Sequence, residues 1–213
     1  MKVVLAQINP TVGALDANSE KIKEIIREYT SQCDLIIFPE MVLTGYPPQD
    51  LLLDDTFIQQ TQEALDGIVA AVKSTAIIVG TIRKENNNLF NTAAVIQDNA
   101  VIAYRDKTYL PTYDVFDEIR YFTPAESITP VELSMGGQTV KIGLQICEDL
   151  WDDEYDTKVS KSLCSQGAEL LINISASPFH INKLQERIEI IGDKAKDLKC
   201  NFIYCNLVGA QDE

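Results

Sequence analysis

The sequence predicts an α/β fold with mixed sheets. Two features indicate α/β: apolar segments of strand length, and helical segments that alternate with them. A third feature, two apolar segments joined by a short polar turn, predicts an antiparallel hairpin, which would make its sheet mixed. The 213 residues fit one domain with a hydrophobic core. Apolar residues make up 46% of the chain and charged residues 23%, so we do not expect disorder.

Strands and helices alternate in the first part of the chain. Apolar runs predict buried strands, and apolar residues on one face, such as Ile22, Ile25 and Ile26, predict amphipathic helices. Pro39 ends the second strand, which places Glu40 just past the strand end. In chain order we expect a buried strand at residues 3–8, a helix at 18–30, a strand at 35–38, a helix at 57–73 and a strand at 76–82.

A hairpin follows, with strands at residues 89–96 and 101–105 joined across residues 97–100. The next stretch, 106–127, has no periodicity. Beyond it the alternation returns. We expect strands at 131–133 and 140–146 joined at Gly136 and Gly137, a helix at 157–165, a strand at 170–175, a helix at 183–198 and a strand at 202–208.

The overall charge excludes two classes of partner. A net charge of -14 argues against nucleic acid and against an anionic membrane surface, because both bind clustered Lys and Arg. No apolar run is long enough to span a bilayer, and the N-terminal segment is too short for a signal peptide. We therefore expect a cytoplasmic protein.

The five cysteines are scattered and form no CxxC pair. This pattern argues against a disulfide framework and against a zinc site. Cys200 and Cys205 flank an apolar segment and are expected to be buried small apolar residues. The acidic run at residues 152–154 is expected to be a solvated helix start and not a metal site.

Three reactive side chains, Glu40, Lys107 and Cys147, come at or just after the ends of predicted strands. Sites in α/β proteins gather beyond the carboxyl ends of strands, where loops converge. Together these groups suit attack on a carbonyl: the thiol attacks, the carboxylate takes the thiol proton, and the ammonium stabilises the oxyanion. The chain has one histidine, His180, so a Cys-His enzyme would depend on that residue alone.

The segments around these residues resemble the nitrilase superfamily of carbon–nitrogen hydrolases, which uses a Glu-Lys-Cys triad. They are Phe38-Pro39-Glu40, residues 106–111 and residues 146–149. The resemblance narrows to the amidase domain of the glutamine-dependent NAD synthetases, covers nearly the whole chain and implies a four-layer α-β-β-α sandwich. The segments that narrow it are 45–52, 113–122, 147–151 and 175–179.

The resemblance also implies an activity and its residues. Glutamine would be hydrolysed to glutamate and ammonia through a thioester on Cys147, with Glu40 as general base, Lys107 stabilising the oxyanion and Glu118 orienting that lysine. The backbone N–H of Glu148 would complete the oxyanion hole. The substrate-binding residues implied are Tyr113, Phe116, Glu148, Trp151, Ser177 and Lys183, the last facing the substrate's carboxylate.

By the same resemblance the amidase step needs no cofactor and no metal. ATP and magnesium would belong to a synthetase domain, whose Ser-Gly-Gly loop is missing from this sequence. We therefore expect residues 1–213 to be a C-terminally truncated glutaminase domain that supplies ammonia to NAD synthesis, and we expect a homo-oligomer. Two alternatives stay open: a stand-alone amidase or nitrilase acting on another small amide or nitrile, and a non-catalytic assembly module.

Overall fold

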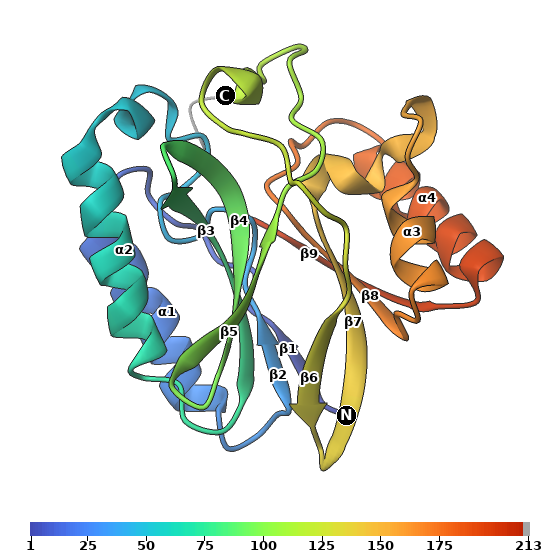
Figure 1. Ribbon diagram of the computed structural model, residues 1–213, viewed down its shortest axis with the longest axis horizontal. Coiled ribbons are helices and arrows are strands. Elements are labelled where there is room, and N and C mark those ends of the chain that lie inside the picture. The colour runs from blue at the N-terminus through green and yellow to red at the C-terminus, as the bar shows by residue number, and fades with distance from the viewer. Residues whose placement is uncertain (211–213) are drawn as a thin grey trace.

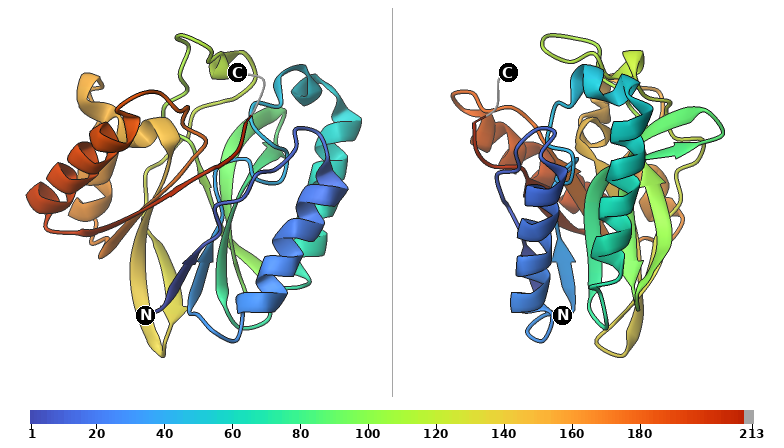
Figure 2. Two further views of the ribbon diagram at one scale, coloured as in Figure 1. Left: turned by 180° about the vertical axis from the view of Figure 1, so that it is seen from behind. Right: turned by 90° about the vertical axis from the view of Figure 1, so that its left-hand side faces the viewer.

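Two β-sheets pack face to face, and helices cover the outer face of each sheet (Figure 1, Figure 2). The computed structural model describes residues 1–210, so expectations about residues 211–213 lie outside the described residues. The order of layers, helix, sheet, sheet and helix, confirms the predicted α/β sandwich. Apolar side chains from the inner faces of both sheets, such as Ile78 and Leu144, form the core between the sheets.

The first sheet is mixed. Its strands β1, β2 and β3 are parallel, whereas β4 and β5 add antiparallel neighbours. Helices α1 and α2 pack on its outer face, where a second apolar core forms. The elements are β1 (Val3–Leu5), α1 (Leu15–Tyr29), β2 (Leu35–Ile37), α2 (Asp55–Val69), β3 (Ala76–Glu85), β4 (Asn88–Gln97) and β5 (Ala100–Asp106).

The second sheet has the order β6-β7-β8-β9, with one antiparallel pair followed by two parallel pairs. Helices α3 and α4 lie on its outer face (Figure 2). Parallel neighbours explain why helices separate these strands along the chain. The elements are β6 (Val131–Met135), β7 (Gln138–Ile146), α3 (Val159–Ser165), β8 (Leu170–Ser175), α4 (Lys183–Leu198) and β9 (Asn201–Asn206).

Every predicted strand and helix is present, but two predictions about the first elements are wrong. The first strand ends at Leu5 and is not buried: it forms the edge of its sheet, and Leu5 is 43% exposed. The first helix begins at Leu15 and not at Asn18. Asn18 lies inside the helix because its side chain bonds both backbone groups of Thr11, at 2.9 and 2.8 Å.

The acidic run at 152–154 is solvated only in part. It forms a short 3₁₀ turn in which Asp153 and Glu154 are exposed, whereas the Asp152 side chain is fully buried against Lys194 of α4. Burial of a carboxylate requires such a partner. Cys200 and Cys205 are buried as predicted.

The aperiodic stretch after β5 contains no strand. It runs over the edge of both sheets at which β5 and β7 end, and it carries a 3₁₀ turn at Glu118–Arg120 (Figure 1). This placement brings residues of the stretch to the carboxyl ends of the strands. Within residues 1–210 we find no helix with both the length and the apolar character needed to cross a membrane.

Candidate active site

Cys147 follows the last residue of β7 and opens a 3₁₀ turn, Cys147–Leu150. Its backbone has φ of 45°, a conformation that costs energy for a residue with a side chain. The thiol is free and only 5% exposed. Asn173 of β8 donates to the Cys147 carbonyl oxygen at 3.3 Å, which holds the turn against the neighbouring strand.

The centre of the site is the ammonium of Lys107, which is fully buried. Its Nζ lies 2.8 Å from Oε1 of Glu40 and 2.7 Å from Oε1 of Glu118. Glu40 is fully buried and Glu118 nearly so. A buried charge requires paired partners, so the two carboxylates and the ammonium depend on one another.

Three further groups donate hydrogen bonds to the carboxylates. Asn91 of β4 donates to Oε1 of Glu40 at 2.7 Å and to Oε2 of Glu118 at 3.4 Å. The phenol of Tyr46 donates to Glu118 at 2.9 Å, and the backbone N–H of Ala176 donates to Glu40 at 2.8 Å. Ala176 follows β8, so Glu40 of the first sheet is held by a group from the second.

Charge and burial set the protonation of the site. Burial raises the pKa of the Cys147 thiol well above its ordinary value; Glu40 raises it further and Lys107 opposes the rise. Burial lowers the pKa of Lys107, but the charges of Glu118 and Glu40 outweigh that effect and hold it well above its ordinary value. The resting site therefore contains a neutral thiol beside an ammonium.

Gly80 of β3 explains how Glu40 reaches this position. A Cβ at Gly80 would lie 2.1 Å from the Pro39 carbonyl oxygen and 2.6 Å from the Glu40 Cα. The turn that carries Glu40 thus lies directly against the backbone of β3. Only glycine allows so close an approach.

Glu148 is held by two phenols. Tyr113 donates to its Oε2 at 2.8 Å and Tyr155 donates to its Oε1 at 3.0 Å. Tyr113 also meets the ring of Phe116 edge to face, with ring centroids 5.6 Å apart. The structure thus brings the predicted residues Tyr113, Phe116 and Glu148 together.

The remaining predicted residues lie on and beside α4. Lys183 places its Nζ 3.8 Å from the centre of the Trp151 ring, a cation–π contact, and 3.4 Å from Glu186. Ser177 accepts from Nη2 of Arg187 at its carbonyl oxygen and at its Oγ, at 3.0 and 3.1 Å.

A cavity of about 560 Å³ lies next to this cluster. Phe116 and Ser177 line it, whereas Lys183 and Trp151 do not. Besides Asn173, four residues of the site that had not been predicted contact predicted ones. They are Tyr46, Asn91, Tyr155 and Arg187, which contact Glu118, Glu40, Glu148 and Ser177 respectively.

One of these four could have been found from sequence. Asn91 is a polar residue inside a predicted strand that is otherwise mostly apolar, and β4 is buried along nearly its whole length. A buried amide needs hydrogen-bond partners, so Asn91 pointed to a polar cluster. Tyr46, Tyr155 and Arg187 gave no such signal, because loop tyrosines and helix arginines are common on surfaces.

The arrangement of possible metal ligands and the glycine pair can both be inspected in the described part of the chain. Among the described residues no group of three His, Cys, Asp or Glu side chains is arranged to hold a metal ion. Gly136 and Gly137, the adjacent glycines, form the turn between β6 and β7 with φ of 57° and 78°. They make a hairpin turn and not a phosphate-binding loop.

A comparison with known proteins finds a family match over nearly the whole chain. Residues 2–213 match the carbon–nitrogen hydrolase family. Among curated relatives, the glutamine-dependent NAD(+) synthetase of Aquifex aeolicus is 39% identical over 100% of this chain and 36% of its own length. That of Synechocystis is 38% identical over 99% of this chain and 40% of its own length. The chain thus spans well under half the length of these relatives.

Solved structures show the same fold. The glutamine-dependent NAD+ synthetase of Acinetobacter baumannii superposes with a TM-score of 0.90 at 34% identity, covering 100% of this chain and 39% of that one. An amidase from Nesterenkonia superposes with a TM-score of 0.82 at 20% identity, covering 99% of this chain and 77% of that one. The second likeness supports the fold alone.

Proposed function

This chain belongs to the carbon–nitrogen hydrolase family, and from that premise we propose that it hydrolyses the side-chain amide of glutamine to glutamate and ammonia. The observation that carries the proposal is the buried ammonium of Lys107, paired with Glu40 and Glu118 and acting electrostatically on the buried thiol of Cys147. A nucleophile, a base and a cation in one buried cluster suit attack on an amide carbonyl. The names of the longer relatives support glutamine as that amide.

In the first half of the reaction, the Cys147 sulfur bonds to the amide carbon while its proton passes to Glu40. Negative charge develops on the amide oxygen, where Lys107 and the backbone N–H of Glu148 would stabilise it. The C–N bond then breaks, and the nitrogen leaves as ammonia with the proton returned by Glu40. The product on the enzyme is a γ-glutamyl thioester.

In the second half, water attacks the thioester carbon and gives its proton to Glu40. The C–S bond breaks, the Cys147 sulfur recovers a proton, and glutamate leaves. While Glu40 carries the proton, Glu118 remains the carboxylate partner of Lys107, because its Oε1 lies 2.7 Å from the lysine Nζ. Glu118 acts through this contact and orients the lysine.

Glutamine needs partners for an ammonium and for a carboxylate. Glu148, fixed by two phenols, suits the ammonium. Lys183 suits the carboxylate, because among the described residues its ammonium meets the Trp151 face and Glu186 at 3.4 Å. Arg187 lines the cavity, but its Nη2 already donates to three acceptors in the loop at Ser177 and Pro178. Trp151, Phe116 and Ser177 would shape the pocket.

The ammonia is proposed to serve NAD synthesis. The matched relatives are much longer than this chain, which supports residues 1–213 as a glutaminase domain that works with a synthetase domain. ATP and magnesium would act in that other domain, and no step here is assigned to them. A homo-oligomer stays a prediction.

The test is release of ammonia and glutamate from glutamine by the wild type, Cys147→Ala and Cys164→Ala. We expect the first variant to be inactive and the second to match wild type, because Cys164 lies on α3 and packs against the apolar cluster that contains Cys200. Cys147-dependent hydrolysis of other amides or nitriles with none of glutamine would favour a stand-alone amidase. A folded chain that hydrolyses none of these substrates would favour the assembly module.

A further inference from the structure

Asp149 is a fully buried carboxylate two residues after Cys147. It accepts hydrogen bonds from four N–H groups. Its Oδ1 accepts from the backbone of Thr108 and Tyr109 at 2.9 and 3.0 Å. Its Oδ2 accepts from the backbone of Ile146 at 3.1 Å and from Nη2 of Arg105 at 3.4 Å.

These donors flank the reactive residues. Thr108 and Tyr109 directly follow Lys107, and Ile146 directly precedes Cys147. The lysine segment leaves β5 of the first sheet, whereas the cysteine turn leaves β7 of the second. One carboxylate therefore holds the main chain beside both residues and joins the ends of the two sheets.

Arg105 strengthens the same junction. It is 3% exposed, and its Nε donates to the Leu144 carbonyl oxygen of β7 at 3.1 Å. Its Nη2 also donates to Oγ1 of Thr108 at 2.6 Å. Burial raises the pKa of Asp149, and the Arg105 charge opposes that rise. The guanidinium thus supplies both a counter-charge and a second link between the sheets.

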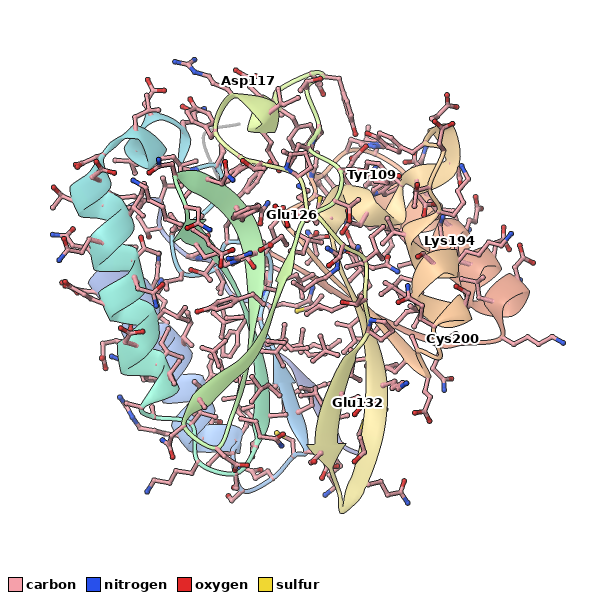
Figure 3. All side chains as sticks on the ribbon, in the orientation of Figure 1. Tyr109, Asp117, Glu126, Glu132, Lys194 and Cys200 are labelled. Carbon is pink, nitrogen blue, oxygen red and sulfur yellow. The ribbon has the colours of Figure 1, made fainter. Side chains whose placement is uncertain are left out.

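The chain direction fits this role. After Lys107 the main chain crosses towards the second sheet, so that Tyr109 lies on the side of α3 (Figure 3). There the Tyr109 phenol donates to the Thr157 carbonyl oxygen at 2.6 Å and its ring stacks on Tyr155, with centroids 3.8 Å apart. Without the four bonds to Asp149 the crossing would lose the contacts that tie it directly to the Cys147 turn.

We propose that Asp149, held by Arg105, is a positioning residue that fixes the distance between Cys147 and Lys107. Its side chain is fully buried and acts through the backbone on either side of the reacting groups. The inference rests on the proposed amide hydrolysis, which it deepens. A displacement of about 1 Å between reacting groups can cost roughly 100-fold in rate, so loosening this junction should lower kcat.

The test compares Asp149→Asn with Asp152→Asn. Both carboxylates are fully buried and paired with one basic residue, but Asp152 pairs with Lys194 and touches neither flank of the reactive residues. Folding is checked by thermal unfolding, and kcat and KM for glutamine are measured well below the unfolding midpoint. We expect Asp149→Asn to lose about 100-fold in kcat with KM within about 3-fold. We expect Asp152→Asn to keep kcat within about 3-fold while unfolding at a lower temperature.

A second readout needs no substrate. Alkylation of Cys147 by iodoacetamide is followed against pH, with the site of modification located by mass spectrometry. Because Lys107 favours the thiolate, moving it away should shift the alkylation midpoint of Asp149→Asn to higher pH. If the wild-type protein does not hydrolyse glutamine, the proposed function is wrong. The pH dependence of Cys147 alkylation would then still test whether Asp149 positions Lys107 and Cys147.

Two results would overturn the inference. One is a folded Asp149→Asn protein with wild-type kcat and an unshifted alkylation midpoint. The other is an equal loss of kcat in Asp149→Asn and Asp152→Asn. If Asp149→Asn does not fold, Arg105→Lys replaces it, because it keeps the charge and loses the forked contacts. That variant should lose about 10-fold in kcat with KM unchanged. Wild-type kcat there would also overturn the inference.

Discussion

Replacing Gly80 with alanine should disable the site without altering any reacting side chain. The added Cβ would lie 2.1 Å from the Pro39 carbonyl oxygen, 2.5 Å from the Met41 nitrogen and 2.6 Å from the Glu40 Cα. Ordinary van der Waals contact begins near 3.4 Å. The Pro39–Met41 turn or β3 must therefore move by about 1 Å.

The turn is the part that should move. Gly80 lies in the middle of β3, which pairs along nine positions with β4 and also lies beside β2. Glu40 is held by bonds of 2.7 to 2.8 Å from Asn91, Lys107 and Ala176. A shift of about 1 Å breaks such bonds, so we expect kcat to fall roughly 100-fold. Overpacking should also cost about 1–3 kcal/mol of stability.

The assay is kcat for ammonia release, with stability from urea unfolding. Gly192→Ala is the matched control, because a Cβ there meets no atom within 4 Å in helix α4. It should keep kcat and gain about 0.5–1 kcal/mol, since alanine favours a helix. A folded Gly80→Ala protein with the kcat of wild type would refute the claim that this contact places Glu40.

Two further predictions concern the substrate pocket and the alkaline stability. Lys183→Met should raise KM for glutamine at least about 10-fold with a smaller effect on kcat. Lys196 is exposed on the same helix, so Lys196→Met should leave both constants unchanged. If Lys183→Met has the KM of wild type, Lys183 does not bind the substrate's carboxylate. Burial raises the pKa of Cys205 from 9.0 to about 12, so the stability due to its neutral thiol is complete below pH 9 and is lost as pH rises towards 12. Between pH 9 and pH 12 the unfolding free energy of Cys205→Ala should therefore fall less steeply than that of wild type, by up to about 1.4 kcal/mol per pH unit in urea unfolding. The same slope for both proteins would contradict a raised pKa for Cys205.

The order of elements could be predicted because each apolar run is bounded by a clear break. Pro39, for example, ends the run before Glu40. The burial of β1 could not be predicted, because an apolar run looks the same at the edge of a sheet and at its centre. The burial of Asp152 could not be predicted for a related reason. Its partner Lys194 lies 42 residues away along the chain, and no local sequence pattern indicates such a pairing.

The candidate triad was accessible from sequence because all three residues occupy the same kind of position, just beyond a strand. The groups that orient them were not, because they come from both sheets and from separate loops. Glu40 takes one hydrogen bond from β4 through Asn91 and another from the end of β8 through Ala176. Such contacts are set by how the sheets pack, which the sequence encodes only through the whole core.

The charge balance of the buried cluster limits how it can work. Two carboxylates, Glu40 and Glu118, share one ammonium next to Cys147. Burial, and after it the charge of Glu40, keeps the thiol protonated and unreactive at rest. Attack then requires transfer of the thiol proton to Glu40 as the bond to carbon forms. An amide that brings its oxygen to Lys107 turns the developing negative charge towards the cation, so the geometry favours the transition state over a free thiolate.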